Sequence, residues 1–339
     1  MSTNALFERI RVSSLVRVQN LSKFFPVTAG LLHRTIGTIK AIDNVTLNIA
    51  RGEILGVVGE SGCGKSTLAR LILRLIEPTS GSIFFDSQNI CRLDKLQLRK
   101  LRRKMQMVFQ DPYSALDPRY SIFRSLAEIY KIQQVDINNQ ELKDRIAELL
   151  LTVGLKPEHS NVYPHQLSGG QKQRVVIARA LALTPEFVIL DEPTAALDVS
   201  VQAQVILLLQ QLRDKFNLTY LFISHDLALV DYFCNRVVVM YLGRVVETLP
   251  ADKVSTSPRH PYTRALADSV FVADPAARKE TAPLEGEVPS PFDLPNGCVF
   301  EARCPYAQNV CRKTAPMLEE VDVGEYVACY FPLGFSSKD

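Results

Sequence analysis

The stretch GESGCGKST, from Gly59 to Thr67, has the residue types and the spacing of a phosphate-binding loop. Its glycines let the backbone turn sharply and direct N–H groups at phosphate oxygens. Lys65 is placed to reach the β- and γ-phosphates of a nucleotide, and Ser66 to supply an oxygen to Mg²⁺. The alternative, a glycine-rich turn that only joins a strand to a helix, is disfavoured because the lysine and hydroxyl residues stand in register with the glycines. The predicted phosphate-binding residues are Gly59, Ser61, Gly62, Cys63, Gly64, Lys65, Ser66 and Thr67.

Two adjacent carboxylates, Asp191 and Glu192, follow the apolar run in FVILDEP. At the carboxyl end of a parallel strand Asp191 can hold Mg²⁺ through water. Glu192, one residue further, points elsewhere and is predicted to act as the general base that orients and deprotonates an attacking water. The alternative for the pair is a solvated strand end.

A second glycine motif, LSGGQKQR, covers residues 167–174. Two glycines at the start of a helix, between a serine and a glutamine, form another backbone anion site. Because one nucleotide needs only one such loop, the motif is predicted to complete the nucleotide pocket of a neighbouring subunit. Alternatively, Ser168 is simply the N-cap of a helix. The residues predicted to act across the subunit interface are Ser168, Gly169, Gly170 and Gln171.

The elements around these motifs alternate between strand and helix patterns. SLVRVQNLSKFF, IDNVTLNIARGEILGVVGE, FVILDEP, YLFISHD and RVVVMYLGRVVE have strand-like apolar patterns. KSTLARLILRLI and VQAQVILLLQQLRDKF repeat at helical spacing, and residues 121–160 form a polar helical block. This order predicts an α/β fold with a mainly parallel sheet and a helical insertion. After about residue 255 the chain becomes proline-rich and irregular, which marks a domain boundary.

Composition excludes several classes of protein. The formal net charge of +3 over 339 residues is too small to indicate nucleic acid as the main partner. No apolar run approaches the roughly 18–20 residues that cross a bilayer, and the first residues carry too many charges for a secretory signal. We therefore expect a cytosolic chain whose seven cysteines are thiols or metal ligands rather than disulfides.

With these motifs in this order, residues 15–255 resemble the ATP-binding subunit of an ABC transporter. The resemblance implies a RecA-like sheet with an antiparallel β subdomain and a helical subdomain at about residues 111–165. It gives four further residues a role: Gln110 of VFQDP touches Mg²⁺ and the attacking water, and His225 of ISHDL contacts the γ-phosphate. Asp198 of AALD belongs to the interface loop, and Phe25 stacks on adenine.

Two positions depart from the family pattern. The adenine-stacking residue is more often tyrosine, and Phe24 stands beside Phe25. The interface loop begins with Ala195 where serine is common. Asp198, Lys65 and Glu192 are retained, so hydrolysis is still expected.

The resemblance also implies a mechanism and its partners. Two ATPase subunits would pair head to tail and trap two ATP molecules, each between the Lys65 loop of one subunit and the Ser168 loop of the other. Mg²⁺ would be held through Ser66, Gln110 and Asp191. Two membrane permeases would supply the pore, an extracellular solute-binding protein would deliver the cargo, and the chain would sit peripherally on the cytoplasmic face of the inner membrane. No nucleic acid is expected.

The chain after residue 255 is predicted to form a C-terminal domain, residues 256–339. Its residues 256–332 resemble the C-terminal region of bacterial dipeptide and oligopeptide importers, through PRHPYTRAL and GEVPSPFDLPNGCVFEARCPYA. The resemblance therefore implies ATP hydrolysis that powers peptide import, with related importers for nickel, opines or glutathione left open. ABC ATPases of DNA repair or translation are disfavoured. The former usually carry a long coiled coil or a DNA-binding domain between these motifs, and the latter carry two cassettes in one chain.

Four of the seven cysteines lie in this tail, at Cys298, Cys304, Cys311 and Cys329. Their spacing lacks the C-x-x-C pairs of most structural zinc sites and the common ferredoxin spacings. Four thiolates could still close on one metal centre and hold together a segment with little core of its own. Members of the importer family with this cysteine set resemble carriers of a [4Fe–4S] cluster; Zn²⁺ and free or oxidised thiols remain alternatives.

Overall fold

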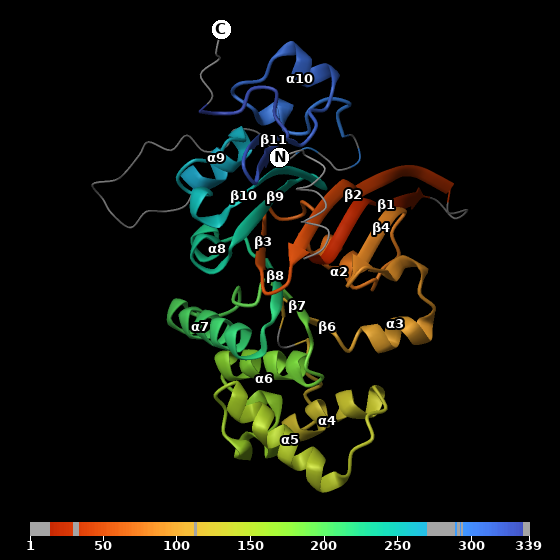
Figure 1. Ribbon diagram of the computed structural model, residues 1–339, viewed down its shortest axis with the longest axis vertical. Coiled ribbons are helices and arrows are strands. Elements are labelled where there is room, and N and C mark those ends of the chain that lie inside the picture. The colour runs from red at the N-terminus through yellow and green to blue at the C-terminus, as the bar shows by residue number, and fades with distance from the viewer. Residues whose placement is uncertain are drawn as a thin grey trace. The chain divides into compact units, whose positions relative to one another are not determined.

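The structure is a computed structural model that describes residues 14–29, 34–111, 114–269, 289, 292 and 294–334 (Figure 1). The chain forms two compact units: unit 1 comprises Met1–Ile49, Ile54–Cys91 and Ser224–Asp339, and unit 2 comprises Ala50–Glu53 and Arg92–Ile223. Part of the tail on which the resemblance rests, including Gly286, Ser290 and Pro291, lies outside the described residues.

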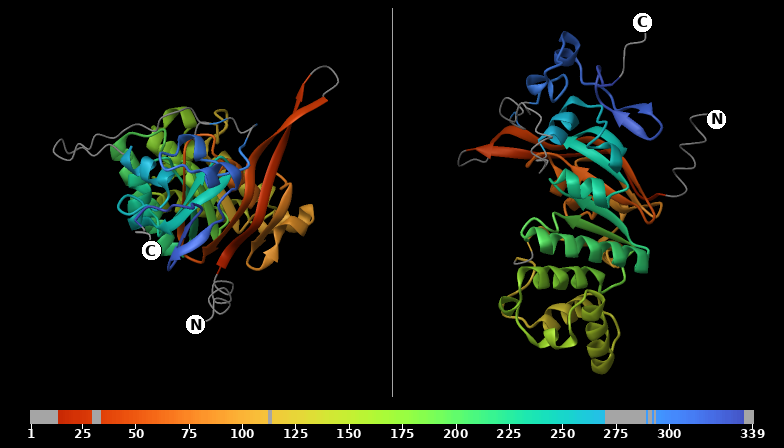
Figure 2. Two further views of the ribbon diagram at one scale, coloured as in Figure 1. Left: turned by 90° about the horizontal axis from the view of Figure 1, so that it is seen from above. Right: turned by 90° about the vertical axis from the view of Figure 1, so that its left-hand side faces the viewer.

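Unit 1 contains an antiparallel sheet with the strand order β2-β1-β4-β5. The strands are β1 (Ser14–Ala29), β2 (Arg34–Ala50), β4 (Ser80–Phe85) and β5 (Gln88–Asn89), and the long β1 and β2 run side by side in Figure 2. Val16 and Val18 of β1 are buried beside Ile83 and Phe85 of β4, because alternate side chains of a strand share one face. This sheet is the expected antiparallel β subdomain.

A second set of strands in unit 1 has the order β11-β12-β10-β9-β3. β3 (Ile54–Val58) pairs in parallel with β9 (Arg236–Tyr241), and β9 pairs antiparallel with β10 (Arg244–Pro250). RVVVMYLGRVVE, which the sequence predicts as one strand, is therefore a hairpin. Its turn residues Leu242 and Gly243 have φ of 44° and 79°, as a two-residue hairpin turn requires.

The C-terminal tail contributes regular structure where the sequence predicted an irregular segment. β11 (Glu319–Asp322) and β12 (Glu325–Val327) form an antiparallel pair, and β12 pairs with β10. In the part of unit 1 that the structure describes, the helices are α2 (Lys65–Ile72), α8 (Leu227–Phe233), α9 (Pro261–Asp268) and α10 (Asn309–Lys313). The tail thus extends the strand set that contains β3, the strand leading into the phosphate loop.

Unit 2 contains three parallel strands in the order β8-β7-β6. They are β6 (Met105–Val108), β7 (Phe187–Asp191) and β8 (Thr219–Ile223), and every residue of β7 and β8 is buried, which is typical of parallel strands covered on both faces. The long helices α6 (Gly169–Leu181) and α7 (Val199–Phe216) pack against each other, and α6 also packs against β6.

The helical block predicted at residues 111–165 is helical in the part that the structure describes. It contains α4 (Ile122–Ile132) and α5 (Asn139–Thr152), and the short turns η2 (Pro157–Asn161) and η3 (Pro164–Gln166) follow. α4 and α5 lie beside α6 in the yellow and green part of Figure 1. Leu126 and Leu150 are fully buried there. Among the residues described, none of the helices is both long and apolar enough to cross a bilayer.

Candidate active site

The predicted phosphate-binding loop follows β3 directly, and two of its positions accept only glycine. Gly59 and Gly64 have φ of 147° and 106°, a region that side chains disfavour. A Cβ atom at Gly59 would lie 2.2 Å from the carbonyl oxygen of Met240, and one at Gly64 would lie 2.5 Å from that of Ala41. The loop therefore passes too close to neighbouring backbone for any other residue at these two positions.

Lys65 is the first residue of α2 and lies inside the loop. Its side chain is 6% exposed, and its Nζ donates hydrogen bonds to the carbonyl oxygens of Gly59 at 2.7 Å and Glu60 at 3.0 Å. Gly64, the N-cap of α2, offers no side chain to cap the helix. A buried ammonium group beside an uncapped helix start is the arrangement that binds phosphate oxygens.

The other predicted loop residues divide by exposure. Ser61 and Gly62 are exposed, and Ser66 and Thr67 are half-buried. Cys63 is only 3% exposed, and burial raises the pKa of its thiol although Lys65 opposes the effect. The Cys63 side chain therefore packs into the protein, and its N–H donates to the carbonyl oxygen of Glu60 at 3.3 Å.

Glu60 itself makes contacts that sequence reasoning missed. Its carboxylate accepts two hydrogen bonds from Arg303, at 2.8 Å from Nη1 and 3.0 Å from Nη2. Its N–H donates to the hydroxyl of Tyr262 at 2.8 Å. Both partners belong to the C-terminal tail, and no short-range pattern in the sequence could connect residues 243 positions apart.

The structure brings Gln110 and Glu192 together in unit 2. Gln110 lies just after β6 and Glu192 just after β7, and the amide Nε2 of Gln110 donates to Oε2 of Glu192 at 2.8 Å. Glu192 has a φ of 47°, a strained conformation for a residue other than glycine, and its N–H donates to Ile223 O at 3.0 Å. Asp191, at the end of β7, is 3% exposed. The amide thus orients the carboxylate.

His225 is exposed and lies beside a pocket in unit 1. The pocket has a volume of about 310 Å³ and is lined by His225, Asp226, Leu227, Val58, Gly59, Leu266 and Ser269. Gly59, the first residue of the phosphate loop, and His225 therefore face one cavity. Phe25, the predicted adenine-stacking residue, is 38% exposed on β1, and Lys23 Nζ lies 4.9 Å from the centre of its ring.

The second glycine motif forms the N-terminus of α6. Ser168 is its N-cap: its hydroxyl accepts from the N–H of Gln171 at 3.3 Å, while the Gln171 side chain accepts from the N–H of Ser168 at 3.0 Å. The capping alternative is therefore realised, and it leaves the motif exposed enough to serve a second role. A Cβ atom at Gly170 would lie 2.6 Å from Cγ1 of Val201, so this glycine lets α6 approach α7 closely.

Asp198 is exposed at the start of α7, and its side chain does not cap that helix. The Gln202 side chain donates to the carbonyl oxygens of Thr194 and Leu197 at 3.1 and 3.0 Å and thereby fixes the loop that carries Asp198. Of the predicted Mg²⁺ ligands, Ser66 belongs to unit 1 and Gln110 and Asp191 to unit 2.

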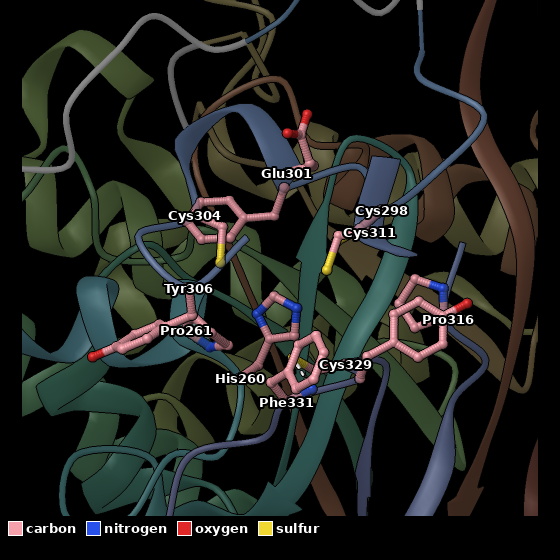
Figure 3. A pocket seen from close by; sticks show the side chains of 12 residues that line it. His260, Pro261, Cys298, Glu301, Cys304, Tyr306, Cys311, Pro316, Cys329 and Phe331 are labelled. Atoms are coloured by element: carbon pink, nitrogen blue, oxygen red, sulfur yellow. Dashed lines mark hydrogen bonds between the residues drawn. The ribbon is translucent and has the colours of Figure 1, made fainter. Parts of the chain in front are cut away.

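The four tail cysteines line one pocket, which we call the thiol pocket. Figure 3 shows the labelled cysteines around the imidazole of His260. Its lining residues include Cys298, Cys304, Cys311, Cys329, His260, Phe300, Glu301 and Tyr306. In the described part of the chain, however, no group of three or more His, Cys, Asp or Glu side chains converges as a metal site would. The fold thus brings the four thiols to one pocket, but the described side chains are not arranged as metal ligands.

Burial favours the uncharged forms of three of the thiols and of the histidine in the thiol pocket. Burial raises the pKa of the Cys298 and Cys304 thiols, and it raises the pKa of Cys329 to about 11. Burial also lowers the pKa of His260 to about 3, so its imidazole is neutral. Neighbouring cysteines of the set also raise the pKa of each of these three thiols. A bound cation would reverse this balance.

Two family models match the chain, one in its N-terminal part and one in its C-terminal part. A family model described as "ABC transporter" matches residues 42–195. A second model, "Oligopeptide/dipeptide transporter, C-terminal region", matches residues 246–311. The oligopeptide transport ATP-binding protein AppF of Bacillus subtilis is 45% identical over 320 residues, which is 94% of this chain and 97% of that protein. A provisionally named peptide import ATP-binding protein of Brucella ovis is 47% identical over 315 residues, 93% of this chain and 97% of that protein.

Solved structures agree on the fold. The ATP-binding cassette MJ0796, in a dimeric post-hydrolysis state bound to ADP and Pi, superposes with a TM-score of 0.62 at 32% identity and covers 70% of this chain and 98% of its own. The cbiO1 protein of Clostridium perfringens, part of the ABC transporter complex cbiONQ, gives a TM-score of 0.62 at 29% identity and covers 72% of this chain and 92% of its own.

Proposed function

This chain belongs to the ABC transporter family as an ATPase of the oligopeptide-importer type, and from that premise we propose that it hydrolyses ATP to power import of dipeptides or oligopeptides. The observation that carries the ATPase is the phosphate loop with Lys65 buried inside it. What supports peptides as cargo is the tail match and the relatives named for peptide import. Importers for nickel, opines or glutathione are the second candidate.

The residues divide the reaction between binding and chemistry. Lys65, with the loop N–H groups, binds the β- and γ-phosphates, and Phe25 stacks on adenine. Ser66, Gln110 and Asp191 would hold Mg²⁺, which would neutralise charge on the phosphates. Glu192, oriented by Gln110, accepts a proton from the attacking water as its oxygen bonds to the γ-phosphorus. The bond from that phosphorus to the bridging oxygen breaks, and ADP and phosphate leave. His225 donates to the γ-phosphate.

A second ATPase subunit completes each site. The N–H groups of the α6 terminus, at Ser168, Gly169, Gly170 and Gln171, together with Asp198, would contact the nucleotide held by the partner's phosphate loop. In the single chain the Ser168 hydroxyl oxygen accepts from the N–H of Gln171, and its O–H would donate to a phosphate oxygen of nucleotide bound in the interface. ATP then closes the pair and hydrolysis reopens it.

The partners follow from the family. We infer two permease subunits that contact the helical block at about residues 111–165, a related second ATPase and an extracellular solute-binding protein. We infer from these partners that the chain lies peripherally on the cytoplasmic face of the inner membrane. We divide the chain into an ATPase domain at residues 15–255 and an importer-type C-terminal domain at residues 256–339.

Cargo identity is testable in the reconstituted importer. The chain, its partner ATPase and the permeases are placed in lipid vesicles, and phosphate release is measured with the binding protein loaded by a peptide, Ni²⁺ or glutathione. We expect peptide to stimulate hydrolysis several-fold more than the other two, because the loaded binding protein favours the closed ATPase pair. If Ni²⁺ or glutathione stimulated hydrolysis and peptide did not, peptide would not be the cargo. The assignment of the chain as an ATPase would still hold.

The thiol pocket supports a further proposal, that it holds a metal centre. Four thiols from one pocket form the soft donor set that iron–sulfur clusters and Zn²⁺ prefer. Cys298, Cys304, Cys311 and Cys329 would be the ligands of a [4Fe–4S] cluster, with Zn²⁺ as the alternative. Such a centre would tie α10 and the segment after β12 that carries Cys329 to the turns at Cys298 and Cys304.

Metal content decides between these alternatives. Protein purified without oxygen is expected to be brown and to carry iron and sulfide, and Cys311→Ser should lose both, because each cluster iron needs its thiolate. Cys91→Ser is the matched control, since Cys91 lies outside the thiol pocket. Colourless wild-type protein with one zinc per chain would exclude the cluster, and metal-free protein would exclude both centres.

A further inference from the structure

Glu60, the second residue of the phosphate loop, is held at each of its polar groups. Its carboxylate is bound by both terminal nitrogens of Arg303 at 2.8 and 3.0 Å. Its N–H donates to Tyr262 at 2.8 Å, and its carbonyl oxygen accepts from Lys65 Nζ at 3.0 Å. The same residue therefore contacts the phosphate-binding lysine on one side and the C-terminal tail on the other.

The Arg303–Glu60 pair differs from an ordinary surface ion pair. The Arg303 side chain is 6% exposed and that of Glu60 is 25% exposed. The two parallel hydrogen bonds form the planar fork that guanidinium makes with carboxylate. Arg303 Nη1 also lies 3.3 Å from the hydroxyl of Tyr241. Removing either partner would leave a largely buried charge without its counterion, which is costly.

The tail residues that hold Glu60 are themselves fixed by aromatic packing. The ring of Phe300 lies 5.3 Å from that of Tyr241 and 5.4 Å from that of Tyr262, centre to centre. Tyr262 is completely buried and Phe300 is 1% exposed. Arg303 ends the short turn η6 (Glu301–Arg303), which begins directly after Phe300. The Phe300 anchor therefore sets the position of the guanidinium.

From this geometry we propose that Arg303 and Tyr262 are positioning residues for nucleotide binding: they fix Glu60 and so hold the phosphate loop in its binding shape. The proposal rests on the phosphate loop being the ATP site. Neither residue takes part in the chemistry, because both act through Glu60. When Glu60 is released, the loop populates other conformations, and the apparent affinity for nucleotide falls by the fraction of loops that remain competent.

A positioning role differs from a purely structural one in what it changes. If the tail only stabilises the fold, loss of Arg303 lowers the melting temperature and leaves the affinity of the folded fraction intact. If Arg303 positions the loop, the folded variant binds nucleotide more weakly and KM for ATP rises more than kcat falls. The two roles therefore separate in a KM-against-kcat comparison.

The test is equilibrium binding of a fluorescent ATP analogue to the purified full chain, with melting temperature measured in parallel. Arg303→Ala and Glu60→Gln should each weaken binding on the order of 10-fold, and the double variant should be no weaker than either single one, because the two residues act as one unit. Arg303→Lys should restore part of the affinity through its charge. Tyr262→Phe keeps the buried ring and should weaken binding by a smaller factor.

Arg312→Ala is the matched control. Arg312 also belongs to the tail and pairs with a carboxylate, Glu301 at 2.8 Å, but its side chain is 68% exposed and it bonds no loop residue. We expect wild-type affinity in this variant. Folded Arg303→Ala and Tyr262→Phe proteins with wild-type affinity would overturn the proposal, and should Arg303→Ala not fold, Arg303→Lys and Tyr262→Phe decide it. Absence of binding by the wild-type chain would instead refute the ATP site itself.

Discussion

Replacing Glu192 by glutamine is expected to lower ATP hydrolysis by roughly 100-fold to 10,000-fold, the contribution typical of a general base. Glutamine has nearly the same shape and its amide oxygen can still accept the hydrogen bond from Gln110, which is 2.8 Å from the native carboxylate. The amide cannot accept a proton from water at neutral pH. Nucleotide binding should therefore survive, and the ATP-bound pair of subunits should accumulate because hydrolysis no longer reopens it.

Phosphate release and subunit association of this variant are measured side by side. Glu141→Gln provides a matched control, because Glu141 lies on the exposed face of α5 and pairs there with Arg145. It should hydrolyse ATP at the wild-type rate. Hydrolysis at the wild-type rate in Glu192→Gln would show that Glu192 is not the general base and that another residue has this role.

Replacing Lys65 by alanine should abolish nucleotide binding and hydrolysis together. Lys65 is the buried cation of the phosphate loop, and its Nζ also joins the carbonyl oxygens of Gly59 and Glu60. Without it, the phosphates meet an anion site that has lost its fixed charge, and the loop loses an internal crosslink. We expect affinity for ATP to fall at least about 100-fold, which corresponds to the loss of a largely buried charge-assisted contact.

Titration calorimetry with Mg²⁺ and ATP measures this change directly. Lys104→Ala serves as the control, because Lys104 is half-exposed and pairs with Glu186. Melting temperature shows whether Lys65→Ala remains folded. A folded Lys65→Ala protein that binds ATP as tightly as the wild type would show that the loop does not bind the phosphates through this residue.

Local motifs allowed much of the fold and the phosphate loop to be predicted. Gly59, Gly64 and Lys65 belong to a nine-residue pattern that can be recognised by itself, because a phosphate-binding loop is formed by consecutive residues. The sequence also predicts β3, β7 and α7, because the apolar pattern of a strand or helix lies within the element itself. The hairpin turn at Leu242 and Gly243 was missed because an apolar run on both sides resembles one long strand.

Contacts between distant segments were not predictable in this way. Arg303 and Glu60 are 243 positions apart, and nothing near either residue indicates the other. The gathering of Cys298 and Cys329 in one pocket likewise depends on packing of the tail against β10. The Gln110–Glu192 hydrogen bond joins two side chains that are far apart in the sequence. Gln110 alone carries no signal, and its expected role comes from family resemblance.

A parallel measurement of three proteins tests whether this chain binds ATP through Lys65 and hydrolyses it through Glu192. ATP binding and phosphate release are measured together for the wild type, Glu192→Gln and Lys65→Ala. We expect the wild type to bind and hydrolyse ATP, Glu192→Gln to bind ATP without hydrolysing it, and Lys65→Ala to do neither. Hydrolysis at the wild-type rate by either folded variant would contradict this expectation.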